Sequence, residues 1–284
     1  MVRIKVDERR RNNLEKLHTA THIVNFAAQK VLGNHIWQHG SNLKEDIGSL
    51  DITHYKQLTQ DEIFQIENVV QDLISKEEDV FVEELERTQA EQKYGFRLYQ
   101  GGAIPQRKLR IIHVGEYDIE ACGGLHVGNS RDIRLFKITS TLKLQDGVIR
   151  LEYKVDSFAY TFVQKQQREL YNTAQGLSVD WKSVSKSATK FFNDWKNTRK
   201  QIEQMHESIS KIHFSNISNS PKIETYEIEE ELPTKYLQEL FEEGKKKHFS
   251  FTLISPQFIL STKDSIEFDY KKLIKREEMY QYIR

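Results

Sequence analysis

Hydrophobic residues recur every three or four positions over residues 7–33, and this spacing predicts one amphipathic helix. Asp7 is suited to cap the start of the helix, and Gly33 stands where helices commonly end. The side of the helix expected to face the core consists of six residues at intervals of three and four: Leu14, Leu17, Thr21, Val24, Ala28 and Val31. The first element is therefore expected to be a long helix with one buried face.

Short apolar runs separated by polar turns follow this helix and predict an α+β domain with helices packed on an antiparallel sheet. A helix is predicted over residues 59–75, because Thr59 and Glu62 have the spacing of a capping box. A short helix is predicted over residues 88–93, and residues 145–147 have the composition of a hairpin turn. The predicted strands are residues 34–38, 49–54, 80–84, 109–114, 133–143 and 148–155.

The rest of the chain predicts two further parts, so that the expected domains are residues 1–156, 157–215 and 216–284. The middle part contains two predicted helices, residues 158–171 and 181–214, and favours a solvated helical hairpin or coiled coil. Contact with nucleic acid is the alternative, because nine Lys and Arg face five Asp and Glu over residues 160–214. The last part begins with a polar linker, residues 216–221, and continues as a small αβ unit. Its basic run, residues 245–248, is interpreted as a solvated turn, with phosphate contact as the alternative.

Composition limits the classes of protein that the chain can belong to. Its 284 residues contain 42 Lys and Arg and 42 Asp and Glu, so no overall basic field points to nucleic acid. Cys122 is the single cysteine, which excludes disulfides within the chain and fits a reducing compartment. No apolar run approaches the length of a membrane span. We expect a cytoplasmic protein without a membrane partner.

Four potential metal ligands form two pairs that are about a hundred residues apart: His18 with His22, and Cys122 with His126. The first pair stands at i and i+4 on the predicted helix, so both rings emerge on one face. The second pair flanks two glycines after a predicted strand, where a tight loop could converge on the helix. Each pair alone is common in surface or core positions, but together they predict a metal site. A thiolate with imidazoles suits Zn²⁺, whereas Mg²⁺ and Ca²⁺ prefer oxygen ligands.

Four motifs around these residues resemble the editing domain of alanyl-tRNA synthetases of the archaeal type, whose core is shared by free-standing alanyl-tRNA editing proteins. The motifs are LHTATHI, LDITHY, AEQKYGF and EACGGLH, at residues 17–23, 50–55, 90–96 and 120–126. The resemblance covers residues 2–156, and the helical region after it is similar to the linker of the synthetase. It implies a zinc-containing editing domain, tRNA(Ala) as partner, and His18, His22, Cys122 and His126 as zinc ligands.

The resemblance also implies hydrolysis of tRNA(Ala) that carries serine or glycine. An alanine pocket cannot fully exclude glycine or strongly reject an added hydroxyl, so a second site must remove the wrong amino acid. Thr19, Thr21 and Gln38 are candidates for polar recognition of the substrate, with helix packing as the alternative for both threonines. Asp51 and His54 are candidates for orienting groups around the metal. His35 and His113 are interpreted as incidental.

Two residues depart from the family pattern: Leu125 stands where the loop normally has threonine, and Arg134 where glycine is usual. Four protein ligands would make a closed, structural zinc site, whereas a catalytic zinc keeps one position open, and the sequence leaves both alternatives. We find no segment resembling the synthetase catalytic core or its glycine-rich barrel. We therefore favour a separately encoded C-terminal half that acts with an N-terminal aminoacylation fragment and performs no ATP-dependent ligation by itself. The alternatives are a free-standing trans-editing deacylase, a fragment of a longer chain, and a non-catalytic tRNA-binding subunit.

Overall fold

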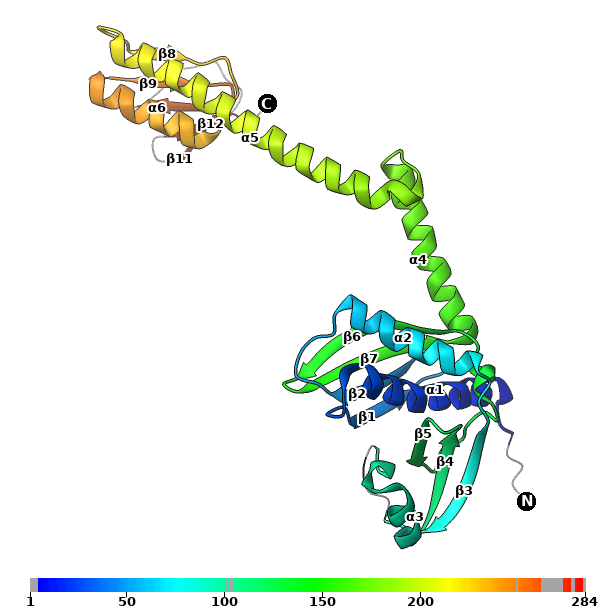
Figure 1. The fold of residues 1–284 in the computed structure, drawn as a ribbon. Helices are drawn as coiled ribbons and strands as arrows, with labels where there is room; N and C mark the ends of the chain where they lie inside the picture. Colours follow the sequence, from blue (N-terminus) through cyan, green and yellow to red (C-terminus); the bar gives the residue numbers. More distant parts are fainter. Residues whose placement is uncertain are drawn as a thin grey trace. The chain divides into compact units, whose positions relative to one another are not determined.

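The computed structural model describes residues 5–100, 102, 105–248, 250–261, 273–276 and 279–282 (Figure 1). The chain divides into two compact units, Met1–Asn172 and Thr173–Arg284. Some of the residues predicted to form the last αβ unit, among them residues 262–272, lie outside the described part of the chain. Each unit mixes helices with largely antiparallel sheet, which confirms the α+β class.

The first helix, α1, spans Glu8–Leu32 and confirms the predicted amphipathic helix. The side chain of Asp7 accepts a hydrogen bond from the backbone N–H of Arg10 at 3.1 Å, which satisfies one free donor of the first turn. Gly33 ends the helix with a φ of 113°, a conformation that favours glycine. The predicted inner face is buried at Leu17, Val24 and Ala28, so α1 is anchored along its length.

A four-stranded antiparallel sheet in the order β1-β2-β7-β6 forms the centre of the first unit. Helix α1 and helix α2, Gln60–Ser75, pack together and against this sheet, as Figure 1 shows. In β2, Leu50 and Ile52 are completely buried, and their alternate positions place both side chains on one face of the sheet. The strands are β1 Gln38–Leu43, β2 Gly48–Thr53, β6 Phe136–Gln145 and β7 Val148–Val155.

Two strand predictions in this sheet were wrong in position. Residues 34–37 do not form a strand, because the chain still turns out of α1 there: the backbone N–H of Ile36 donates to the carbonyl of Gly33 at 3.2 Å. The strand expected from residue 133 begins only at Phe136, since Ser130–Ile133 is a short 3-10 helix, η2. In both places a buried isoleucine resembled a strand residue but anchors a turn.

The capping box predicted for α2 is confirmed. The hydroxyl of Thr59 accepts from the backbone N–H of Glu62 at 3.2 Å, and the Glu62 carboxylate accepts from the backbone N–H of Thr59 at 2.8 Å. The hairpin between β6 and β7 is also confirmed, with Gly147 at a φ of 77°. These local signals place the elements that cover the sheet.

A smaller three-stranded sheet, in the order β3-β4-β5, carries the second half of the predicted metal site. Strand β5 contacts α1 and leads directly into Cys122. This sheet has its own buried cluster, made of Ala90, Leu98, Leu109, Ile111 and Ala121. Its elements are β3 Val80–Glu86, α3 Arg87–Tyr94, η1 Phe96–Leu98, β4 Lys108–Val114 and β5 Asp118–Ala121.

Arg134 adopts a φ of 63° and a ψ of −99°, a conformation that is unfavourable for any residue with a side chain. This explains why a glycine would suit the position where this chain departs from the family pattern. Its guanidinium lies 3.2 Å from a carboxylate oxygen of Asp156, which also forms an ion pair with Lys16. The departure is therefore accommodated at the surface, beside the start of the next helix.

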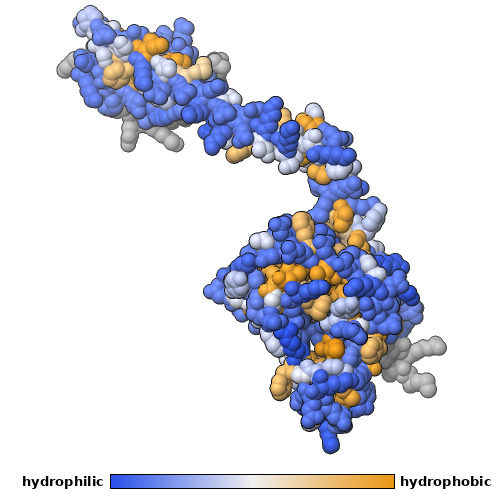
Figure 2. All heavy atoms as spheres, in the orientation of Figure 1, coloured by the Kyte–Doolittle hydropathy of each residue, from blue (hydrophilic) through white to orange (hydrophobic). Residues whose placement is uncertain are grey.

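Helix α4, Asp156–Gly176, and helix α5, Val184–Asn219, confirm the two long helices predicted after the sheet domain. The polar linker predicted over residues 216–221 was largely wrong, because Ile217 is completely buried in the core of the second unit and keeps α5 helical to Asn219. Figure 2 shows a predominantly hydrophilic surface interrupted by hydrophobic patches. On α5, the aromatic side chains of Phe192 and Trp195 are more than half exposed.

Helix α6, Thr234–Lys247, packs on a five-stranded sheet in the order β11-β12-β10-β9-β8. The basic run predicted to be a solvated turn instead forms the last turn of α6, where positive charge is favoured by the helix dipole. None of the described helices is long and apolar enough to cross a membrane. The strands are β8 Thr225–Glu227, β9 Thr252–Ile254, β10 Phe258–Ser261, β11 Leu273–Arg276 and β12 Met279–Tyr282.

Candidate metal centre

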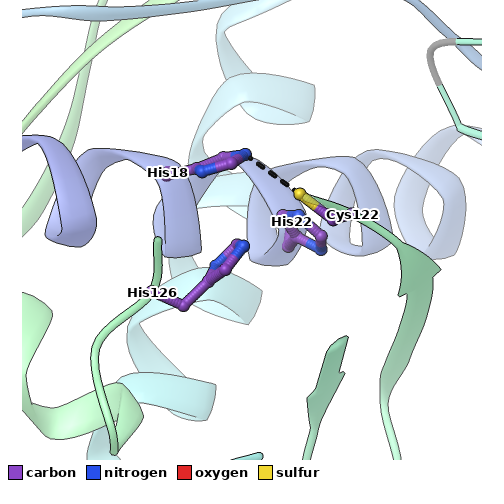
Figure 3. A group of neighbouring side chains, drawn as sticks. All are labelled: His18, His22, Cys122 and His126. Atoms are coloured by element: carbon purple, nitrogen blue, oxygen red, sulfur yellow. Dashed lines mark hydrogen bonds between the residues drawn. The ribbon is translucent and has the colours of Figure 1, made fainter. Parts of the chain in front are cut away.

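The four predicted metal ligands converge at one place in the first unit, as Figure 3 shows. One potential ligand atom from each of His18, His22, Cys122 and His126 lies within 4.8 Å of all the others. Bond lengths of a tetrahedral zinc centre would separate N and S ligands by roughly 3.3–3.6 Å, so a small contraction would complete such a centre. The structure therefore brings together both pairs that are far apart in sequence.

Helix geometry and strand direction produce this convergence. His18 and His22 are one turn apart on α1, and their ring centroids are 5.5 Å apart. Strand β5 ends at Ala121 and directs Cys122 toward the helix, with its Sγ 3.4 Å from Nε2 of His18. The ring of His126 lies 4.3 Å from that of His18 and 4.7 Å from that of His22, centroid to centroid.

The charge states of Cys122 and His126 favour metal binding, whereas the pKa of His22 is raised and its ring must lose a proton before it can bind. Burial alone would raise the pKa of the Cys122 thiol, but the three histidines around it lower that pKa to about 3. Burial, together with the two neighbouring histidines, lowers the pKa of His126 to about 4. A thiolate and a neutral imidazole are the ligand forms that a transition metal requires.

One buried nitrogen in the cluster has no protein partner. Nε2 of His126 is buried and makes no hydrogen bond within the described part of the chain. An unpaired buried polar atom costs free energy, so it calls for a ligand. A cation among three imidazoles and a thiolate would satisfy this atom, and the donor set fits Zn²⁺.

The loop between the ligands is held by Arg110 of β4, a residue that the sequence did not single out. Its Nη1 donates to the carbonyl oxygens of Cys122 and Gly124, each at 2.8 Å. Gly124 has no positive φ, so unusual backbone angles do not require a glycine there. Instead, a Cβ at Gly124 would lie 1.9 Å from Cε1 of His18, so glycine is required for close packing.

Buried carboxylates lie behind His22 and were also missed from the sequence. Nδ1 of His22 is 2.9 Å from Oδ2 of Asp118 and 3.4 Å from Oε2 of Glu120, and Asn25 donates to Glu120 at 2.9 Å. Burial lowers the pKa of His22, but the two carboxylates raise it well above its usual value overall. Burial and the charge of Asp118 raise the pKa of Glu120 to about 8. One signal in the sequence could have identified Asp118 and Glu120: they occupy alternate positions of β5, the strand that ends just before the predicted ligand Cys122.

The two candidate threonines of α1 have different surroundings. The hydroxyl of Thr19 lies 3.2 Å from Nδ1 of His126, directly beside the cluster. The hydroxyl of Thr21 donates to the carbonyl of Leu17 at 2.9 Å and lies 2.5 Å from the Tyr153 hydroxyl, between helix and sheet. Thr19 therefore contacts the cluster through a ligand, and Thr21 contacts the core.

Gln38 and Asp51 are not part of the cluster. Gln38 is the first residue of β1, and its backbone N–H donates to the side chain of Gln100 at 3.1 Å. Asp51 lies on β2, where both carboxylate oxygens accept from Arg150 of β7, at 2.7 and 2.9 Å.

The remaining histidines of the first unit that the sequence singled out also lie outside the cluster. His54 and His35 contact each other, with 2.9 Å between Nδ1 of the former and Nε2 of the latter. Nε2 of His113 lies 3.0 Å from a carboxylate oxygen of Glu83. Among the described residues, none of these three is grouped with the four ligands.

A cleft of about 590 Å³ borders the cluster at His18. Arg10 and Arg11 contribute positive charge to its wall, and Asp7 and Glu15 contribute negative charge. The rest of the wall is apolar: Val6, Leu14, Leu43 and Leu125. The residue that departs from the family loop, Leu125, is half exposed and lies at this cleft.

Sequence comparisons show which proteins the chain is similar to. Residues 109–152, which include Cys122 and His126, match the family described as "Threonyl and Alanyl tRNA synthetase second additional domain". The curated relatives that match over most of the chain are alanine–tRNA ligases. The chain is therefore related to the editing and C-terminal part of alanyl-tRNA synthetases, which confirms the resemblance in the sequence motifs.

Three archaeal enzymes illustrate the extent of the similarity. The chain is 44% identical to the alanine–tRNA ligase of Methanocella arvoryzae over 201 residues, which are 71% of the chain and 23% of that enzyme. It is 40% identical to the alanine–tRNA ligase of Methanococcus aeolicus over 225 residues, which are 79% of the chain and 25% of that enzyme. It is 34% identical to the alanine–tRNA ligase of Pyrococcus abyssi over 281 residues, which are 97% of the chain and 31% of that enzyme. The chain thus spans about a quarter to a third of these relatives, and the last match extends into the C-terminal unit, where we had found no resemblance.

Proposed function

We propose that the chain is the editing part of an alanine–tRNA ligase, and that it hydrolyses tRNA(Ala) carrying serine or glycine. The single observation that carries this proposal is the convergence of His18, His22, Cys122 and His126, with a buried and unpaired Nε2 on His126. The relationship to alanine–tRNA ligases supports the substrate class. We further propose that the chain acts together with an aminoacylation fragment, because the relatives that it matches are alanine–tRNA ligases.

The four ligands would hold Zn²⁺. When bound, the ion would organise the pocket, and it would polarise the ester bond as a Lewis acid once one of the four ligands leaves a position open. His18 is the ligand that borders the cleft, so the substrate would reach the centre from that side. Arg10 and Arg11 would contact phosphates of the acceptor end, since guanidinium groups bind phosphate in a bidentate manner.

Selectivity requires that correctly charged tRNA is spared. A site that forms a hydrogen bond with the serine hydroxyl loses that bond with alanine and leaves a buried polar group unpaired. We propose Gln38, which stands where the family resemblance implies a functional polar residue, as the candidate for this recognition, because the hydroxyl of Thr21 is already bonded within the core. Asp51 would then act by holding the sheet through Arg150, because both of its oxygens are already bonded.

A deacylation assay tests the proposal. The purified chain, with and without an aminoacylation fragment, is incubated with Ser-tRNA(Ala), Gly-tRNA(Ala) and Ala-tRNA(Ala), and its zinc content is measured. We expect the wild-type chain to release serine and glycine but not alanine. The His126→Gln variant should release serine at least about 100-fold more slowly, because losing a group that holds the metal or stabilises charge typically costs a factor of this order.

The matched control is His213→Gln, a histidine of the second unit that contacts Tyr226. This variant should retain the wild-type rate. A zinc-containing wild-type chain that binds tRNA(Ala) but releases no serine, even with the fragment present, would reject hydrolysis and favour a binding subunit.

A further inference from the structure

Three histidines in the cluster each have two ring nitrogens, and only one nitrogen of each can face a shared ion. A neutral imidazole carries its proton on one nitrogen and binds metal through the other. The structure contains partners on the far side of two rings, and their donor and acceptor properties decide which nitrogen is free.

The hydrogen bonds of Thr19 settle the tautomer of His126. The Thr19 hydroxyl has a single hydrogen and lies 3.0 Å from the carbonyl oxygen of Glu15, which can only accept. It therefore donates to Glu15, and it accepts from the backbone N–H of Val127 at 3.2 Å. The remaining contact, 3.2 Å to Nδ1 of His126, is a hydrogen bond only if Nδ1 carries the proton.

This tautomer leaves a lone pair on Nε2 of His126. Nε2 is the nitrogen that is buried without a partner, on the side of the cluster. The hydroxyl of Thr19 is itself completely buried, so water does not compete for this arrangement. Thr19 thus presents Nε2 of His126 to the centre.

His22 is oriented in the same way by a carboxylate. Its Nδ1 lies 2.9 Å from Oδ2 of Asp118, and both side chains are more than nine-tenths buried. An ionised carboxylate can only accept, so Nδ1 of His22 donates to it. Glu120 lies further from the same nitrogen, at 3.4 Å, and is held by Asn25. The other nitrogen of His22 then faces the cluster.

We propose that Asp118 and Thr19 are positioning residues: each accepts a hydrogen bond from Nδ1–H of a metal-binding histidine and holds its Nε2 as the ligand. This inference rests on the proposed zinc centre and assigns Thr19 to the metal site rather than to substrate recognition. Carboxylates and hydroxyls that orient ligating histidines raise metal affinity, and their removal typically weakens binding about 10- to 100-fold.

The test measures the zinc dissociation constant of the full chain by competition with a chromophoric chelator. We expect Asp118→Asn and Thr19→Val to bind zinc about 10- to 100-fold more weakly than the wild type. In Asp118→Asn the amide group can donate to Nδ1 and so favour the tautomer with its proton on Nε2, which blocks the ligand. Ring nitrogen chemical shifts of the metal-free protein should report this change of tautomer at a pH above the raised pKa of His22.

Two controls separate positioning from folding. Thr21→Val removes a hydroxyl from the same helix, at Tyr153, and Asp46→Asn removes a carboxylate charge that pairs with Lys154. Both should retain wild-type zinc affinity, even where Thr21→Val lowers the melting temperature. Thr19→Ser keeps the hydroxyl and should restore the affinity that Thr19→Val loses.

If the wild-type chain binds zinc, and Asp118→Asn and Thr19→Val change neither the zinc affinity nor the ring shifts, this inference is overturned. The proposed function would then still stand. Weakened affinity in a chain that binds zinc but releases no serine would support the inference and reject the proposed function. A wild-type chain without affinity for zinc would overturn the inference itself.

Discussion

Gly124 shows how one residue without a side chain sets the geometry of the candidate centre. The spacing of His18, His22, Cys122 and His126 was predicted from the sequence, because two periodic pairs are visible without a structure. The reason for Gly124 was not, because the contact is with a ring about a hundred residues away. Asp118 was missed in the same way, and Thr19 was singled out for substrate recognition rather than for a contact with His126, since hydrogen-bond direction depends on atoms that only folding brings together.

Gly124→Ala should therefore damage the centre while leaving the fold intact. The new methyl group would lie 1.9 Å from Cε1 of His18, so the ring must move away from Cys122. We expect zinc affinity to fall at least about 10-fold, as for other losses of ligand orientation, measured by chelator competition. Gly123→Ala is the matched control, because nothing lies within 4 Å of its Cβ position and its φ is not positive. Equal zinc affinities of the two variants would contradict the packing role of Gly124.

At the scale of elements, the sequence predicted what local rules control. The caps of α1 and α2, and the turn between β6 and β7, depend on neighbouring residues and were confirmed. Two other predictions were wrong: the strand at residues 34–37 and the linker at residues 216–221. Distant parts of the chain bury Ile36 and Ile217 at these places. Tertiary packing overrides local pattern at such positions.

The capping box of α2 predicts a pH dependence of stability. The backbone N–H of Thr59, with Lys56 as a further donor, lowers the pKa of Glu62 from its ordinary 4.5 to about 2. A carboxyl whose pKa is lower in the folded state stabilises the fold above its ordinary pKa, and this contribution disappears as pH falls to the folded value. Glu62→Gln should therefore be less stable than the wild type at neutral pH, with a difference that shrinks between about pH 4.5 and about pH 2.

Urea denaturation at a series of pH values measures this difference. Glu84→Gln provides a comparison at an exposed carboxylate of β3 that pairs with Lys108, where an ion pair contributes little. A stability difference for Glu62→Gln that stays constant from neutral pH to about pH 2 would contradict the charge-based part of the cap.

At the scale of the molecule, the candidate centre lies where helix α1 meets the three-stranded sheet of the first unit. Helix α1 belongs to the layer on the four-stranded sheet, whereas Cys122 follows β5 of the three-stranded sheet. An ion held by both would link the two sheets and stabilise the folded state, because the unfolded chain does not preform the site. The second unit has its own buried cluster, around Leu240 and Phe251, and contains none of the four ligands.

Metal removal should therefore affect the two units unequally. Free ligand at 100 times its dissociation constant stabilises a native state by about 2.7 kcal/mol, so a chelator should lower the stability of the first unit by at least this amount. Hydrogen exchange with and without chelator can measure the change segment by segment. We expect faster exchange in α1 and β5, which carry the ligands or lead into them, and unchanged exchange in α6. Uniform acceleration in both units, or none in α1, would be inconsistent with a metal centre that links the two sheets of the first unit.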